Sequence, residues 1–179
     1  MRKCLAAVAL LVTFTGCGGR IPNHVTTDEY GVYAEWMKAH FSTNPPNNLY
    51  VDSRTFVFDP LSSGCANAIH GKAGVPWALI KQLHALGEAE YWLPDAYSST
   101  RLSIPWSYRL VDGLPLISRE SGPYRLVGFS RVAFDTTHSK AFFAVSDACG
   151  GLCGGGGAVY AHKQNNAWVF KSGGCDWMY

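Results

Sequence analysis

The sequence carries little charge and has only one long apolar run. Charged residues make up 16% of its 179 positions, and the formal net charge is +2. The apolar run, residues 5–14, is shorter than the ~20 residues that a membrane-spanning helix needs. Nucleic-acid binding depends on clustered lysine and arginine residues, and a chain with so few charged residues gives no electrostatic reason to expect it. We therefore expect a globular body with a sizeable core and no nucleic-acid partner.

The N-terminal stretch "MRKCLAAVALLVTFTGCGG" has the pattern of an export signal. Two basic residues precede the apolar run, and small residues precede Cys17. This resembles the lipobox of bacterial lipoproteins, where the chain is cut before a cysteine whose thiol carries a lipid. The alternative is an ordinary secretory signal cut a few residues later. Both readings export the chain, and Gly18 after the cysteine, by resemblance to Gram-negative sorting, favours the outer membrane.

Cleavage before Cys17 divides the chain into three parts. Residues 1–16 form the signal peptide, 17–25 a tether, and 26–179 one domain by the usual size range. Two cations leave with the signal, so the formal charge falls from +2 to zero. The predicted membrane partner is reached through the lipid on Cys17, not through a spanning helix.

Four cysteines remain after Cys4 is removed and Cys17 is lipidated. They are Cys65, Cys149, Cys153 and Cys175. An even number in an oxidising compartment predicts two disulfides, with three possible pairings. We favour Cys149–Cys153 with Cys65–Cys175. By loop-closure entropy the short bridge contributes ~2 kcal/mol and the long one ~5 kcal/mol.

Two helices are predicted in the first half of the domain. Thr26 or Thr27 can cap the first, whose opening turn is acidic. Its apolar residues at helical spacing are Tyr30, Tyr33, Met37 and Phe41. Pro76 suits the start of the second helix and Gly87 its end. Between the helices we predict a strand over residues 49–58 and a loop over 59–74.

The last third of the chain alternates apolar and polar residues, as strands do. The runs are "YRLVGFSRVAF", "KAFFAVS", "AVYAHK" and "AWVFKS", with a turn at Gln164-Asn165-Asn166 between the last two. A further short strand fits residues 106–111. The predicted fold is α+β, with two helices packed on a C-terminal antiparallel β-meander.

The stretch "DACGGLCGGGGAVY", residues 147–160, admits several interpretations. A phosphate-binding loop would need a following helix and a lysine, which are lacking. Zinc binding by these cysteines with His138 or His162 requires free thiols. Redox exchange normally uses a pair of cysteines with two residues between them. A catalytic cysteine with His162 and either Asp147 or Asp176 is a further alternative. We favour a hairpin loop whose glycines supply unusual backbone angles and whose disulfide limits them.

The C-terminal segments "GFSRVAFD", "CGGLCGGGG", "NNAWVF" and the final "DW" resemble a family of uncharacterised secreted bacterial proteins. The resemblance covers about 60 residues well. It implies a fold and an envelope location, but no activity. It does not extend to Cys175.

Candidate ligand-binding residues are mainly aromatic. Trp92, Tyr97 and Trp106 fall in the irregular segment 88–124, where exposed rings could stack on sugars or peptides, and Arg131 could bind an anion. The alternatives are aromatics that attach the segment to the core and an arginine that pairs with a carboxylate.

The leading functional expectation is a non-enzymatic envelope lipoprotein with a structural or interaction role. It needs no cofactor or metal, and its partner is an envelope protein or glycan. The second is a binding module for a glycan, peptide or small ligand that uses the aromatics of residues 88–124. A hydrolase is third, and a pocket that joins two convergent carboxylates, or a histidine and a free cysteine, would favour it.

Overall fold

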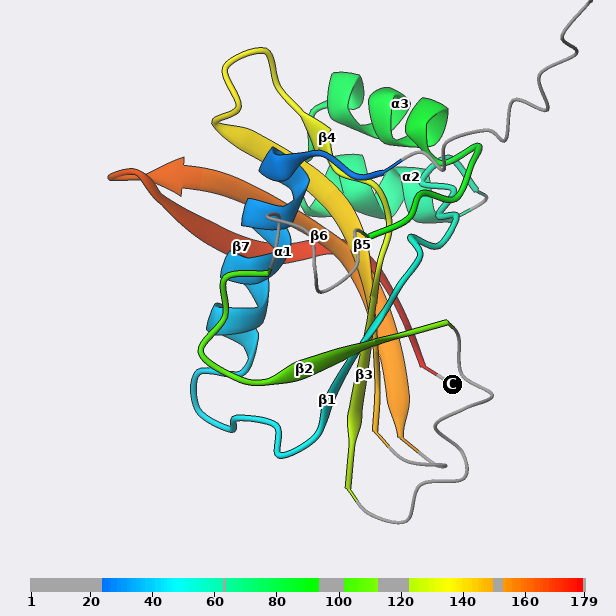
Figure 1. Ribbon diagram of the computed structural model, residues 1–179. Helices are drawn as coiled ribbons and strands as arrows, with labels where there is room; N and C mark the ends of the chain where they lie inside the picture. The colour runs from blue at the N-terminus through cyan, green and yellow to red at the C-terminus, as the bar shows by residue number, and fades with distance from the viewer. Residues whose placement is uncertain (1–23, 63, 94–101, 113–122, 150–152, 179) are drawn as a thin grey trace, which may run out of the picture.

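In the computed structural model, the described residues are 24–62, 64–93, 102–112, 123–149 and 153–178 (Figure 1). The predicted signal peptide, the lipidation site at Cys17 and the candidate aromatic Tyr97 lie outside these ranges. Within them, none of the helices has the length and apolar character needed to cross a membrane.

A seven-stranded mixed sheet forms the centre of an α+β fold. The strands are β1 (Leu49–Asp52), β2 (Tyr108–Val111), β3 (Arg125–Phe129), β4 (Ala133–Phe134), β5 (Lys140–Ala148), β6 (Gly154–Gln164) and β7 (Ala167–Met178). Their order is β2-β1-β3-β5-β6-β7, with β4 paired to β5. Strands β3, β5, β6 and β7 are antiparallel neighbours, which confirms the predicted meander.

The other end of the sheet is parallel, which the sequence did not indicate. Leu49 pairs with Tyr108 in β2 and with Arg125 in β3, and both pairings are parallel. The strand predicted over residues 49–58 was too long, because β1 ends at Asp52.

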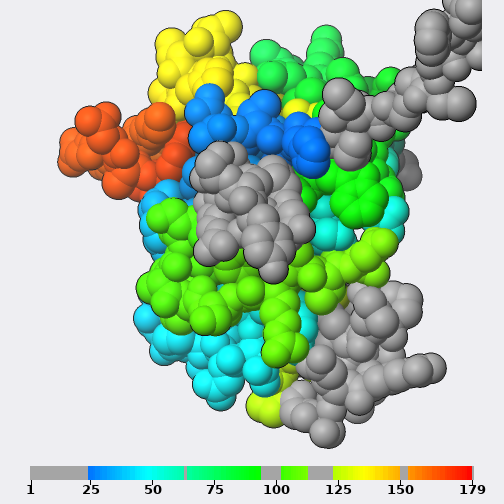
Figure 2. All heavy atoms as spheres, viewed as in Figure 1, coloured from blue at the N-terminus to red at the C-terminus, as the bar shows by residue number. Residues whose placement is uncertain are grey.

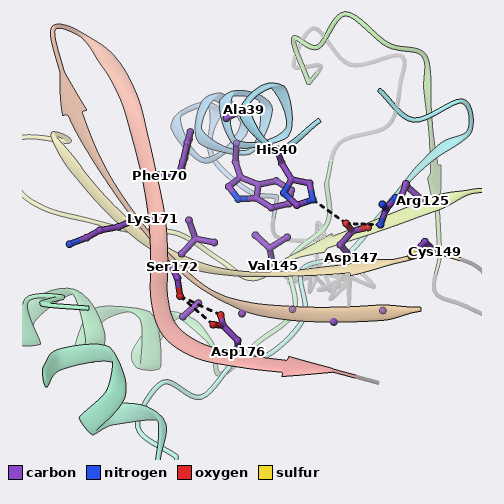
Figure 3. A pocket seen from close by; sticks show the side chains of 17 residues that line it. Ala39, His40, Arg125, Val145, Asp147, Cys149, Phe170, Lys171, Ser172 and Asp176 are labelled. Carbon is purple, nitrogen blue, oxygen red and sulfur yellow. Dashed lines mark hydrogen bonds and ion pairs between the residues drawn. The ribbon is translucent and has the colours of Figure 1, made fainter. Parts of the chain in front are cut away.

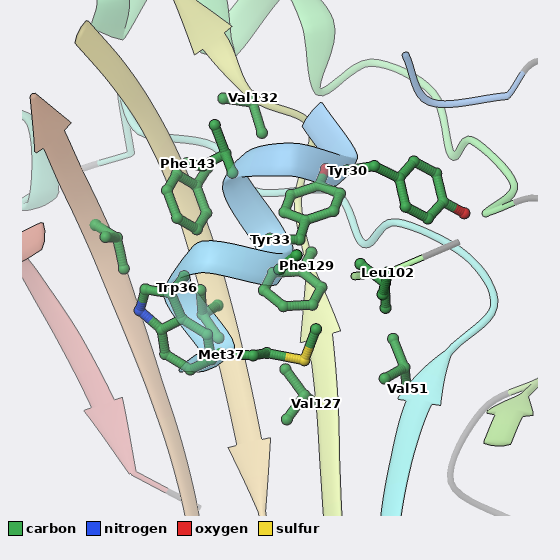
Figure 4. Packing of buried hydrophobic residues seen from close by; sticks show 14 of the residues in the cluster. Tyr30, Tyr33, Trp36, Met37, Val51, Leu102, Val127, Phe129, Val132 and Phe143 are labelled. Carbon is green, nitrogen blue, oxygen red and sulfur yellow. The ribbon is translucent and has the colours of Figure 1, made fainter. Parts of the chain in front are cut away.

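The first helix, α1 (Thr27–His40), begins as predicted. Thr26 is its N-cap and forms a capping box with Glu29. The Glu29 backbone N–H donates to the Thr26 hydroxyl, and the Thr26 backbone N–H donates to the Glu29 carboxylate. The apolar stripe is buried against one face of the sheet, where the Tyr33 ring stacks on Phe129 at 4.3 Å and Met37 lies beside it (Figure 4). Burial of this stripe holds α1 in place.

The opposite face of the sheet is covered by three helical segments. They are α2 (Cys65–Asn67), the π-helical turn η1 (Ala68–Lys72) and α3 (Trp77–Leu86). Since side chains alternate along a strand, Phe143 packs with α1 whereas Phe142 packs with α3. Both predicted helices are present, as α1 and α3, but the loop predicted over 59–74 contains a further helical segment, α2 with η1. The extra helical segment is too short to show periodicity, and the fully buried Ile69 fixes it by tertiary contact.

Both predicted disulfides are present. Cys65–Cys175 (the long disulfide) joins α2 to β7, and Cys149–Cys153 (the short disulfide) joins the ends of β5 and β6. The Cα atoms are 5.2 Å apart in each pair. Two disulfides are consistent with an exported protein.

The predicted hairpin is present between β5 and β6 and is closed by the short disulfide, but Gly154–Gly157 are not part of its loop, which corrects the prediction for these glycines. Gly154–Gly157 belong to β6 and pair with β5. The hairpin that follows has the predicted turn, because Asn165 and Asn166 have φ of 51° and 63°, as a two-residue turn of this kind requires. The tip of this β6–β7 hairpin, in orange, stands out from the body of the molecule in Figure 2.

Candidate functional site

A groove of about 630 Å³ lies between the end of α1 and the sheet (Figure 3). We call it the glycine groove. Its walls come from Trp36, Ala39 and His40 on α1, and its floor comes from β5, β6 and β7. The volume lies within the range of ordinary small-molecule sites.

The groove exists because β6 has no side chains where it crosses the floor. Gly157 pairs with Val145 and Gly155 pairs with Asp147, and both partners face the α1 side of the sheet. Any larger residue at these glycines would fill the space. An added Cβ at Gly157 would collide with the Asp176 carboxylate, and one at Gly155 would lie 2.7 Å from a backbone carbonyl. Glycine is therefore used here for space, not for a positive φ.

One carboxylate joins three elements at the end of the groove. Asp147 Oδ2, on β5, lies 3.1 Å from His40 Nε2 on α1 and 3.1 Å from Arg125 Nη1 on β3 (Figure 3). The His40 ring stacks on Trp36 at 4.4 Å, which fixes its orientation. The arrangement holds a hydrogen-bonding group at a defined point on the groove wall.

The second oxygen of this carboxylate has an unfilled hydrogen-bonding capacity. Asp147 Oδ1 is buried and makes no hydrogen bond to any residue that the structure describes. Buried polar atoms in native proteins are almost always paired, so an unpaired carboxylate oxygen indicates a site for a donor from outside the chain. Because less than 1 Å² of this atom is accessible, a ligand hydroxyl, amine or water supplies the donor only if neighbouring side chains move.

A second carboxylate lies farther along the floor. Asp176 on β7 faces the Ser172 hydroxyl at 3.5 and 3.4 Å, a weak contact, and the same hydroxyl accepts from the Gly174 backbone N–H at 3.1 Å. Phe170 lines the same side of the groove. The groove thus combines acceptors, one guanidinium and apolar surface.

The aromatic residues and the arginine that the sequence indicated lie elsewhere. Trp92 is exposed, with the Arg54 guanidinium 5.5 Å from its ring centre. Trp106 is half-buried and packs edge-on against Phe41 at 6.0 Å, which attaches its segment to the core. None of Trp92, Trp106 or Arg131 lines the glycine groove.

Arg131 is committed to a buried ion pair. Its Nε and Nη2 atoms donate to the two Glu29 carboxylate oxygens at 2.6 and 3.1 Å, and its guanidinium lies 3.7 Å from the Tyr91 ring centre. Burial alone would lower the pKa of Arg131, but the hydrogen bonds and the charge of Glu29 raise it above its ordinary value. Its role in the structure is to hold α1 to the sheet.

The histidines considered for zinc are not gathered into a ligand set. His138 Nδ1 lies 2.9 Å from an Asp28 carboxylate oxygen, and His162 lies within β6. Among the described residues, no three histidine, cysteine, aspartate or glutamate side chains are placed to hold a metal ion together.

The sequence indicated Asp147 and Asp176 only as partners of a catalytic cysteine, and it gave no signal for His40 or Arg125. One signal could have revealed part of the groove. A disulfide between Cys149 and Cys153 sets the hairpin register, which places a glycine opposite Asp147.

Comparisons of the chain with known family models, with curated proteins and with solved structures found no match. The resemblance to secreted bacterial proteins therefore stays a prediction.

Proposed function

We propose that this chain is an exported envelope protein whose domain binds a small polar ligand in the glycine groove. The observation that carries the proposal is the open groove, which is lined by Asp147, a carboxylate whose Oδ1 has no hydrogen-bond partner among the described residues. His40 and Arg125 hold the other oxygen of the same carboxylate, so the group is oriented before any ligand arrives. Such preorganisation lowers the entropic cost of binding.

The composition of the groove favours a ligand with several hydroxyl or amide groups. The carboxylates of Asp147 and Asp176 accept hydrogen bonds, the Arg125 guanidinium donates them, and the Ser172 hydroxyl does both. Phe170 adds apolar surface for the carbon skeleton. A purely apolar ligand would leave these polar groups desolvated and unpaired, which is unfavourable.

The envelope location rests on the N-terminal sequence. The lipobox-like segment before Cys17 supports a lipid anchor, and Gly18 favours the outer membrane. The two disulfides support the broader statement that the chain is exported. Mass spectrometry of the mature protein tests the anchor, because a chain that begins at Cys17 without added lipid mass contradicts it.

A variant with a larger side chain in the groove tests the binding site. We expect wild-type protein to bind a member of a panel of monosaccharides, N-acetylated sugars and dipeptides, with a shift in tryptophan fluorescence from Trp36. Gly157→Leu places a side chain in the groove, where the nearest obstacle is the movable Asp176 carboxylate. This variant should bind at least about tenfold more weakly.

Two matched variants serve as controls for the groove. Gly31→Leu makes the same change on the exposed side of α1, where nothing lies within 4 Å of an added Cβ. His84→Ala removes a different histidine–aspartate contact, 2.9 Å from Asp59, whereas His40→Ala removes the one in the groove. Equal affinity in Gly157→Leu and Gly31→Leu would show that the ligand binds elsewhere.

A hydrolase is the second candidate, because the groove contains two carboxylates on one face of the sheet. Strand register places the Cα atoms of Asp147 and Asp176 two strands and two residues apart, roughly 12 Å by ordinary strand spacing. Glycoside hydrolysis uses a pair of carboxylates that flank the scissile bond. Turnover of a bound saccharide that is lost in both Asp147→Asn and Asp176→Asn would establish it; stable binding without turnover would exclude it.

A further inference from the structure

The glycine groove continues into further hollows at one end of the sheet. A second hollow, of about 350 Å³, shares Arg125 and Cys149 with it. A third, of about 240 Å³, shares Asn47 and Asn48 with the second. The shared lining residues make the three hollows neighbours, and we call the line that joins them the path.

The path crosses the strands instead of following one of them. The glycine groove lies over β7, β6 and β5, the second hollow lies at the start of β3 and the short disulfide, and the third lies over β1 and β2. This is the spatial order of the sheet. A ligand that occupied the whole path would therefore be an extended chain that lies across the sheet.

The second hollow differs in chemistry from the groove. The residues that line it are mainly asparagines and prolines, with Tyr124 and Arg125: Asn44, Pro45, Pro46, Asn47, Asn48 and Pro123. Asn48 Nδ2 donates to the Pro123 carbonyl at 3.3 Å, which ties together the two loops that form its walls. Side-chain amides pair with hydroxyl groups as donor and acceptor, while proline and tyrosine rings offer flat apolar surface.

We infer that the ligand is a linear glycan whose successive sugar units occupy the glycine groove and the second hollow. This inference rests on the proposed function. A sugar unit presents hydroxyl groups at its edge and C–H groups on its ring faces, and the path offers carboxylates, amides and ring surfaces to match. The third hollow gives room for the chain to continue past Asn47.

An extended peptide fits the path less well. Peptides that bind sheets usually add as a strand to an open edge, where unpaired N–H and C=O groups receive them. This path crosses β5, β6 and β3, whose backbone groups already pair with neighbouring strands. A peptide main chain would find few partners there.

A length series tests the inference. Titration calorimetry with β-1,4-linked oligomers of N-acetylglucosamine and of glucose, from one to six units, should show affinity rising about tenfold with length and then levelling off. The double variant Asn44→Ala/Asn47→Ala should remove this gain for long oligomers and leave the affinity for the shortest binding sugar unchanged. Asn67→Ala, an exposed asparagine on α2, is the control and should keep the gain.

The outcomes separate this inference from the proposed function. Binding of short sugars with no gain in affinity for longer oligomers overturns the inference alone. A length-dependent gain with peptides, and none with sugars, also overturns it alone. Sugar binding that Gly157→Leu leaves unchanged, or no binding of any probe, overturns the proposed function and the inference together.

Discussion

Replacing Glu29 by alanine should lower the free energy of unfolding by about 3–5 kcal/mol, the usual effect of removing one partner of a buried ion pair. The Glu29 side chain is 2% exposed and that of Arg131 is 9% exposed. Glu29 accepts from Arg131 at two atoms, from the Val132 backbone N–H at 3.0 Å and from the Thr26 backbone N–H at 2.8 Å. The variant would leave a buried guanidinium and two backbone donors without their acceptor.

A double-mutant cycle shows how much of this loss belongs to the pair. Arg131→Met alone should also destabilise by about 3–5 kcal/mol, because it leaves the Glu29 carboxylate buried without its counter-ion. The combined variant Glu29→Ala/Arg131→Met removes both charges together. It should be destabilised by about as much as either single variant, which gives a coupling energy of about 3–5 kcal/mol.

The measurement is urea unfolding of the domain, with both disulfides intact, followed by tryptophan fluorescence. Glu35→Ala is the matched control, since Glu35 on the same helix makes an exposed ion pair with Lys38 at 2.8 Å. This variant should change stability by about 0.5 kcal/mol or less. Additive effects of the two single variants, or a loss at Glu29 no larger than at Glu35, would refute the reasoning.

Three further predictions concern stability. Gly31→Ala should stabilise the protein by about 0.5–1 kcal/mol, because the site is helical and open. Gly74→Ala should destabilise it, since Gly74 has φ of +68°, which alanine disfavours. Thermal unfolding of both variants tests this pair. Despite some desolvation, hydrogen bonds from Lys140 and Ser139 lower the pKa of Asp135 below its ordinary 3.8. The ionised Asp135 carboxylate therefore stabilises the fold above that pH, and this stabilisation is lost as the pH falls below it. Asp135→Asn should flatten the acid limb of a stability-versus-pH curve, and an unchanged limb would contradict this. Replacing both cysteines of the long disulfide by serine should destabilise by about 4–5 kcal/mol, against ~2 kcal/mol for the short disulfide; equal losses in urea unfolding would show that loop length does not govern the effect.

Local sequence signals predicted the elements that depend on local physics. The start of α1 follows from the cap at Thr26, and the strands of the meander follow from their alternation. The parallel pairing of β1 with β2 does not have such a signal, because it depends on which distant segments meet. The glycines of β6 were misassigned because glycine is depleted in strands, and only pairing on both sides keeps this segment extended.

The candidate site was harder to predict than the fold. The groove takes residues from α1, β3, β5, β6 and β7, and no short motif includes His40, Arg125 and Asp147 together. The pairing of Glu29 with Arg131 is similar, since the two residues are separated by 102 positions. The sequence identified Arg131 as an arginine among apolar neighbours, but its partner was visible only in three dimensions.

The place of β1 within the sheet has a consequence for the time course of folding. Leu49 pairs only with residues that follow it at a long distance, Tyr108 on one side and Arg125 on the other. During synthesis β1 emerges well before either neighbour, so its backbone groups stay solvated until most of the chain is available. Closing such long loops slows folding, in contrast to the β5–β6 and β6–β7 hairpins, which can form as soon as they are made. The C-terminal hairpins are therefore the expected nucleus, and the strand nearest the N-terminus is among the last to join the sheet.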